Sequence, residues 1–252
     1  MQTPNLKTIA TDYQTALNTI TRRIIICAGT GCVANGAMDV HDRFVEEFTA
    51  RGMDVRVELD VHDCAPKDNA TLISRSGCQG FCQMGPLVSV DPEGLLYVKV
   101  RPDDVTEIIE TTFLQGDIVE RLLYHDPRSG EVMRGKGEIP FYTRQTRRIL
   151  KNCGEIDAED MNEYIATGGY LAAEKAFTQM TPEDICQNVL DSGIRGRGGG
   201  GFPTGRKWEL TRVQPAGKKY VICNGDEGDP GAFMDRSVME GNPHAVIEGM
   251  LI

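Results

Sequence analysis

The chain has 252 residues, 40% of them hydrophobic and 25% charged, so it can form a folded core and is not generally disordered. Its 27 basic and 37 acidic side chains leave a net charge of -10, which argues against a nucleic-acid-binding surface. The longest aliphatic run, Ile24 to Ile26, is far shorter than the about 20 apolar residues of a membrane span.

Residues 1–20 predict an amphipathic docking helix, because their apolar residues recur at spacings of three and four. The segment lacks the continuous apolar stretch of a secretory signal. We therefore expect a cytoplasmic protein, in which the eight cysteines of the chain stay reduced.

Residues 21–115 predict a small α/β domain. The pattern opens with a strand, a loop and a helix, and closes with a helix after further strands. The last two strands are joined by the turn sequence Asp91-Pro92-Glu93-Gly94. The predicted strands lie at 24–27, 55–59, 72–74, 87–90 and 95–100, and the first helix at 38–50.

Residues 116–145 contain several turn signals and little periodicity, and we interpret them as an ordered or semi-ordered linker. Its apolar residues Met133, Ile139, Phe141 and Tyr142 indicate that part of it packs on another element.

Residues 146–252 form the last predicted domain and begin with helical segments near 157–164 and 171–177. A further helix has a clear start at Thr181-Pro182 and stops at Gly193.

Four cysteines form two pairs, each on a glycine-rich segment after a predicted strand. Cys27 and Cys32 lie in CAGTGC, and Cys78 and Cys82 lie in GCQGFC. Four thiolates from two loops can hold the two irons of a [2Fe-2S] cluster, and glycine lets backbone amides approach the sulfur atoms. A zinc site favours two-residue gaps, which neither pair has, but it stays an alternative, as do four unrelated thiols. Cys64 lies outside the pattern, and we interpret it as an inert buried thiol.

The run from Cys27 to Val100 resembles the thioredoxin-like [2Fe-2S] ferredoxin domain. The resemblance is carried by CAGTGC, GCQGFCQMGPLVSV and the strand pair that follows. This domain occurs in the small subunit of respiratory NADH dehydrogenases and at the N-terminus of the flavin subunit of many hydrogenases.

The second motif is RGRGGGGFPTGRKWE, residues 195–209. Its Gly196, Gly198 and Gly201 match a dinucleotide fingerprint, but a predicted helix precedes them where that motif requires a strand. The seven glycines from Gly193 to Gly205 leave the backbone free of side chains, so its amides can approach a flat ring or phosphates. A flexible loop without a ligand is the alternative.

The third motif is VICNGDEGDPGAFMDR, residues 221–236. It predicts a short strand over 220–223 that ends in a polar cluster of Asn224, Asp226, Glu227 and Asp229. Polar groups at a strand end are typical of ligand sites in α/β proteins. A calcium loop is less favoured, because its characteristic spacing is absent.

With these two motifs in this order, residues 140–252 resemble the N-terminal part of the FMN- and NADH-binding subunit of respiratory NADH dehydrogenase. The fused ferredoxin narrows the resemblance to diaphorase-type flavin subunits of NAD(P)-linked, often electron-bifurcating hydrogenases and of formate dehydrogenases. The resemblance implies stacking of Phe202 on the adenine of the nucleotide, and an NADH contact at Asp229, where respiratory relatives usually have glutamate. It implies FMN contacts for Gly196, Gly198, Gly199, Lys207, Asn224, Asp226 and Glu227.

The implied fold is α/β, with a thioredoxin-like [2Fe-2S] domain, a linker, and the start of an FMN/NADH-binding α/β domain. The implied function is electron transfer between NAD(H) or NADP(H) and iron-sulfur centres through FMN, which takes up a two-electron hydride and passes electrons on singly. Expected partners are a small [2Fe-2S] subunit and the catalytic subunit of a hydrogenase or formate dehydrogenase complex.

The sequence ends in an apolar helical run from Ala245 without a stop signal. We therefore expect a piece of a longer protein, whose remaining C-terminal part would hold [4Fe-4S] clusters. The alternative is a non-catalytic [2Fe-2S] carrier or docking module with an incomplete flavin domain.

Overall fold

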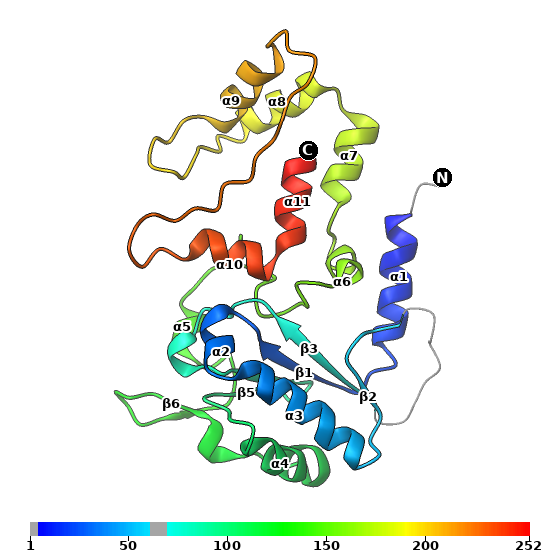
Figure 1. The fold of residues 1–252 in the computed structure, drawn as a ribbon, viewed down its shortest axis with the longest axis vertical. Helices are drawn as coiled ribbons and strands as arrows, with labels where there is room; N and C mark the ends of the chain where they lie inside the picture. The colour runs from blue at the N-terminus through cyan, green and yellow to red at the C-terminus, as the bar shows by residue number, and fades with distance from the viewer. Residues whose placement is uncertain (1–4, 61–69) are drawn as a thin grey trace.

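The computed structural model describes residues 5–60 and 70–252, so Cys64 lies outside the described residues. A five-stranded mixed sheet occupies one half of the structure, and helices from the second half of the chain lie beyond one end of it (Figure 1). Within the described ranges, no helix is long and apolar enough to cross a membrane.

The sheet has the strand order β2-β3-β1-β4-β5. Strand β1 runs parallel to β3 and antiparallel to β4, and β4 pairs antiparallel with β5. A β-α-β unit followed by a hairpin and a helix is the connectivity of the thioredoxin fold, so the expected α/β fold class is confirmed. The strands are β1 (Arg22–Cys27), β2 (Val55–Arg56), β3 (Thr71–Ser76), β4 (Val88–Asp91) and β5 (Leu95–Tyr97).

The core of this domain forms where α3 (Ala37–Ala50) packs on the sheet. Phe44 and Phe48 lie one turn apart on α3 and are fully buried. They meet the apolar face of α4 (Asp104–Ile108), which continues as the π-helical turn η2 (Ile109–Gln115). The central strand β1 is buried on both faces, which explains its uninterrupted run of isoleucines.

The N-terminal helix α1 (Leu6–Leu17) confirms the predicted helix. Its N-cap Asn5 accepts hydrogen bonds from the backbone N–H groups of Lys7 and Thr8. It packs against α6 (Met161–Ala166), so the first and the later parts of the chain are in contact.

The predicted linker 116–145 is ordered and packs on the sheet domain. It contains the 3-10 turn η3 (Glu120–Leu122), the strands β6 (Tyr124–His125) and β7 (Val132–Met133), and α5 (Pro140–Thr143). Ile139 is fully buried in the core of the sheet domain, and Met133 is nearly so.

The second half of the described chain is helical, and it contains most of the helices that the sequence predicts there. Thr181 and Asp184 form a capping box at the start of α8, as the start signal indicated. The helices are α7 (Leu171–Gln179), α8 (Pro182–Asp191), α9 (Thr204–Arg212), α10 (Met234–Gly241) and α11 (Pro243–Leu251).

The predicted strand over 220–223 is wrong. The stretch 213–233 has no helix or strand, and Tyr220, Val221 and Ile222 are 72%, 67% and 84% exposed. A strand needs a neighbour to bond its N–H and C=O groups, and no described strand lies beside this stretch. The strand expected over 55–59 is similarly reduced to Val55–Arg56.

Candidate functional site

The four paired cysteines lie together at one end of the sheet. Cys27 is the last residue of β1, and Cys78 follows β3, the parallel neighbour of β1. The carboxyl ends of parallel strands meet at the same edge, so the two pairs converge. The second cysteine of each pair lies on a helical turn rather than a loop: Cys32 in α2 (Thr30–Ala34) and Cys82 at the start of the 3-10 turn η1 (Cys82–Met84).

The thiols form a connected array. Cys32 and Cys78 both lie close enough to Cys27 to shift its pKa, and the Sγ atoms of Cys78 and Cys82 are 3.8 Å apart. Cys27 and Cys32 are buried, whereas Cys82 is exposed. The array therefore has an inner and an outer side.

The thiol contacts determine the acidity of the array. The hydrogen bond with Cys32, together with burial, raises the pKa of Cys27 to about 11, and the same bond lowers the pKa of Cys32. The hydrogen bond with Cys27 and burial raise the pKa of Cys78. Cys27 and Cys78 would therefore have to lose their protons in order to bind iron.

The array offers four thiols from two segments. Among the described residues, no group of three or more His, Cys, Asp or Glu side chains is arranged to hold a metal ion. Four cysteine thiolates are the donor set of a [2Fe-2S] cluster. The backbone N–H of Gly80 already donates to Cys78 Sγ at 3.3 Å.

Two buried polar groups beside the array also favour a bound group. The Tyr142 hydroxyl, and both polar atoms of the fully buried Gln79 side chain, find no hydrogen-bond partner among the described residues. Unpaired buried polar atoms are costly, and they mark places where an additional acceptor or donor fits.

Glycines let the two cysteine segments approach each other. A Cβ atom added to Gly29 would lie 2.7 Å from Cys78 Cβ, and one added to Gly85 would lie 2.6 Å from Cys32 Sγ. A Cβ on Gly31 would make only ordinary contacts with Cys82.

The helical part of the chain docks on the cysteine segments through α10. The hydroxyl of Thr30 in α2 donates to Glu240 Oε1 at 2.8 Å, and Glu240 also pairs with Arg236 at 2.8 Å. Gly77 and Gly241 approach so closely that a Cβ on Gly77 would lie 1.9 Å from Gly241 Cα. Figure 1 shows α10 beside the ends of β1 and β3.

The glycine motif forms an exposed loop that closes on itself. The Gly196 N–H donates to Phe202 O at 2.9 Å, and Arg195 Nε donates to Gly201 O at 2.6 Å. A Cβ on Gly198 or Gly199 would meet no described atom within 4 Å, so the backbone there is open to a ligand. The loop lines a cavity of about 440 Å³ and leads into α9.

The polar cluster of the third motif lies on the irregular stretch before α10. Asn224, Asp226 and Asp229 are exposed, and Asn224 Oδ1 accepts the Asp226 N–H at 2.9 Å. Glu227 instead accepts the backbone N–H groups of Asp235 and Arg236, at 2.9 and 3.3 Å, at the start of α10. The loops carrying the second and third motifs project from the same side of the molecule in Figure 1.

Phe202 and Lys207 lie apart from each other around the glycine loop. Phe202 is 48% exposed, so its ring is available for stacking. Lys207 is exposed on α9 and lines a different, mostly apolar cavity of about 700 Å³ with Trp208 and Phe177. The structure thus does not bring Lys207 to the cavity beside the glycine loop.

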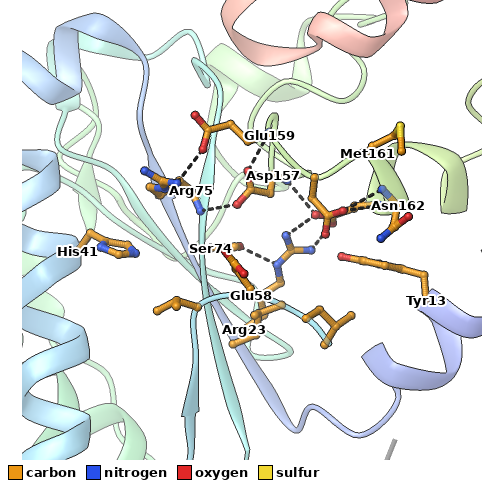
Figure 2. A pocket seen from close by; sticks show the side chains of 15 residues that line it. Tyr13, Arg23, His41, Glu58, Ser74, Arg75, Asp157, Glu159, Met161 and Asn162 are labelled. Carbon is orange, nitrogen blue, oxygen red and sulfur yellow. Dashed lines mark hydrogen bonds and ion pairs between the residues drawn. The ribbon is translucent and has the colours of Figure 1, made fainter. Parts of the chain in front are cut away.

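A further cavity, of about 480 Å³, lies between α1, the sheet and α6 (Figure 2). Its charged groups pair with one another: Arg23 with Glu163 at 2.5 and 2.9 Å, and Arg75 with Glu159 at 2.7 Å. These contacts join β1 and β3 to the α6 region, so we interpret the cavity as a junction between two parts of the chain.

The sequence did not single out Tyr142, Gln79, Thr30 or Glu240. The only signal was the apolar content of the segment 133–142, which indicated packing but not the surface on which it packs. Their positions depend on contacts between segments more than 60 residues apart, such as the bond from Arg147 to the Gln79 carbonyl.

Known proteins resemble this chain in both of its parts. Residues 189–252 match the family model described as the Nuo51 FMN-binding domain. The NADP-reducing hydrogenase subunit HndC of Solidesulfovibrio fructosivorans is 51% identical over 109 residues, 43% of this chain and 22% of the relative. An NADH-quinone oxidoreductase subunit of Aquifex aeolicus is 46% identical over 122 residues, 48% of this chain and 28% of the relative.

Among solved structures, a thioredoxin-like [2Fe-2S] ferredoxin from Aquifex aeolicus is 28% identical, with a TM-score of 0.32. It covers 41% of this chain and 89% of its own chain. The chain spans about a quarter of the length of the curated relatives. The resemblance to the flavin subunits of NADH dehydrogenases and NAD(P)-linked hydrogenases is confirmed, and residues 189–252 match the model of the Nuo51 FMN-binding domain.

Proposed function

We propose that this chain is the part of an NAD(P)H-linked oxidoreductase subunit that passes electrons between FMN and a [2Fe-2S] cluster. The main support is the convergence of four thiols at the edge of the sheet, onto which the helix following the third motif docks. This docking links the two predicted cofactor segments in one folded unit.

The four cysteines would hold the cluster, with Cys82 on its exposed side. When bound, FMN supplies the conversion between a two-electron hydride and single electrons. Gly196, Gly198 and Gly199 would present bare backbone to the flavin, and Phe202 would stack on the nucleotide. Lys207, Asn224, Asp226, Glu227 and Asp229 remain the predicted polar contacts of FMN and NAD(H) or NADP(H).

We place this subunit in a multisubunit complex, because the named relatives are subunits of a hydrogenase and of an NADH-quinone oxidoreductase. A hydrogenase or formate dehydrogenase catalytic subunit and a small [2Fe-2S] subunit are the proposed partners. A cytoplasmic location suits the free thiols.

The cluster assignment is tested by iron and sulfide analysis after anaerobic reconstitution of the chain. We expect two irons per chain and the visible and electron paramagnetic resonance spectra of a [2Fe-2S] cluster. Cys78→Ser should lose most of the iron, whereas Cys186→Ser, a buried thiol on α8 outside the array, should retain it. Zinc in place of iron, or equal iron in both variants, would contradict the assignment.

The flavin assignment is tested at Gly198 in the purified gene product. An added side chain there meets no described protein atom within 4 Å, so Gly198→Val should disturb a ligand rather than the fold. We expect FMN affinity to fall more than tenfold, with cluster content unchanged. Gly217→Val is the matched control, because its Cβ also points into open space. Unchanged affinity in Gly198→Val, or a cluster without any flavin, would favour a plain [2Fe-2S] carrier.

A further inference from the structure

The segment 139–147 forms a lid on the Cys78–Cys82 turn. The ring of Phe141 stacks on Phe81 at 4.7 Å with an interplanar angle of 12°. Tyr142 meets the same Phe81 ring edge-on at 5.7 Å. Arg147 binds the end of the segment to the cysteine turn, because its Nη2 atom donates a hydrogen bond to the Gln79 carbonyl at 2.9 Å.

The Tyr142 hydroxyl is buried without a hydrogen-bond partner in the described ranges. Arg147 lies over the ring at 5.1 Å, so it contacts the face of the ring rather than the hydroxyl. A phenol placed in this way can donate one more hydrogen bond.

The segment lies against the turn that carries two of the thiols. A Cβ on Gly80, which lies between Cys78 and Cys82, would be 3.1 Å from Arg147 Nη2 and 3.7 Å from Phe141 Cε1. Phe81, which Tyr142 contacts, directly precedes Cys82. The side chain of Gln79, next to Cys78, is a second buried group with unpaired polar atoms. Tyr142 is the donor that can be removed alone, because Tyr142→Phe deletes only its hydroxyl.

We propose that Tyr142 donates a hydrogen bond to a sulfur atom of the cluster held by Cys27, Cys32, Cys78 and Cys82, and so raises the reduction potential of that cluster. The proposal rests on the cluster assignment above. Reduction adds negative charge to the sulfur atoms, so a donated hydrogen bond stabilises the reduced state more than the oxidised state. Tyr142 is a positioning and tuning residue, supplied by the segment that the sequence marks as a linker.

The test is a redox titration of the reconstituted chain, monitored by electron paramagnetic resonance. Tyr142→Phe removes only the hydroxyl, and we expect the equilibrium constant for reduction to fall about tenfold, which is about 59 mV for one electron. Tyr124→Phe is the matched control, because the Tyr124 ring also contacts Phe81 edge-on, at 5.3 Å, and its hydroxyl is not an unpaired buried group. The control should keep the potential of the unmodified chain.

A second measurement detects the donated proton directly. The reduced cluster in the unmodified chain should show coupling to an exchangeable proton that disappears in Tyr142→Phe. Equal potentials in the unmodified chain and Tyr142→Phe would overturn the proposal, as would the absence of such a proton or an equal shift in Tyr124→Phe. Failure of the unmodified chain to hold iron would instead overturn the cluster assignment, so the two failures are distinguishable.

Discussion

Single glycines near the cysteines serve two different purposes. The sequence motif predicts that glycine lets backbone amides reach sulfur, and Gly80 does donate its N–H to Cys78. Gly29 and Gly85 instead make room for a cysteine of the opposite segment. The pattern CAGTGC therefore contains glycines of unequal importance, which spacing alone cannot reveal.

Gly29→Ala should damage the cluster more than Gly31→Ala. The new methyl group at Gly29 would lie 2.7 and 2.8 Å from the Cβ and Cα atoms of Cys78, so the Cys78 segment must shift. At Gly31 the nearest atom, Cys82 Cβ, is 3.5 Å away. We expect iron content to fall severalfold in Gly29→Ala and to stay near that of the unmodified chain in Gly31→Ala. Circular dichroism checks that both variants fold, and equal iron contents would contradict the expectation.

At the scale of elements, the contact between β1 and α6 contains a largely buried ion pair. The side chains of Arg23 and Glu163 are 13% and 6% exposed. Burial lowers the pKa of Arg23. The hydrogen bonds that Arg23 donates to Glu163 outweigh the effect of burial, so the pKa of Arg23 lies above its ordinary value. Glu163 also accepts the Asp157 N–H at 2.9 Å, so one carboxylate holds two segments together.

Glu163→Ala should lower the free energy of unfolding by about 3 kcal/mol, because it leaves a buried guanidinium without its partner. Glu159→Ala removes the partner of Arg75 in the same cavity, where the side chains are 45% and 77% exposed, and should cost less than about 1 kcal/mol. Urea denaturation of both variants measures the difference. Similar losses would show that the Arg23 pair adds little beyond a surface pair.

Local patterns predicted the elements of the sheet domain well, because each of them has its own signal. The run Ile24–Cys27 is apolar and short, and α3 repeats its apolar residues every three or four positions. The stretch Tyr220–Cys223 has the same local appearance as a strand, yet it lacks a partner strand in the described structure. Strand formation depends on that neighbour, which no local pattern contains.

The sequence likewise predicted those parts of the candidate site that have a local signal, and missed those that depend on contacts between distant segments. Each cysteine pair was expected on a glycine-rich segment after a predicted strand. The parallel pairing of β1 and β3, which brings the two pairs together, comes from the structure. The lid formed by residues 139–147 and the contact between Thr30 and Glu240 each join distant segments of the chain. Residues of these types are common on protein surfaces, so they give no local signal. Only the folded structure identifies them.

At the scale of the whole molecule, the cysteine segment and helix α10 meet through their backbones at Gly77 and Gly241 rather than through large side chains. Gly77 precedes Cys78, and Gly241 ends α10. Cys153 Sγ lies 3.8 Å from the Ser237 carbonyl on the same helix, and a Cβ on Gly241 would come within 2.7 Å of that sulfur. Such close packing leaves no space for an added methyl group.

Gly77→Ala should therefore separate α10 and α11 from the cysteine segments. Its methyl group would lie 1.9 Å from Gly241 Cα, which is a backbone atom and cannot rotate away. We expect hydrogen–deuterium exchange of residues 234–252 to accelerate severalfold, while the central strand β1 stays protected by its own sheet partners. Gly249→Ala on α11 is the control, because its Cβ meets no described atom within 4 Å, and it should leave exchange unchanged or slower. If α10 keeps its protection in Gly77→Ala, the contact between Gly77 and Gly241 is not what holds the two parts of the chain together.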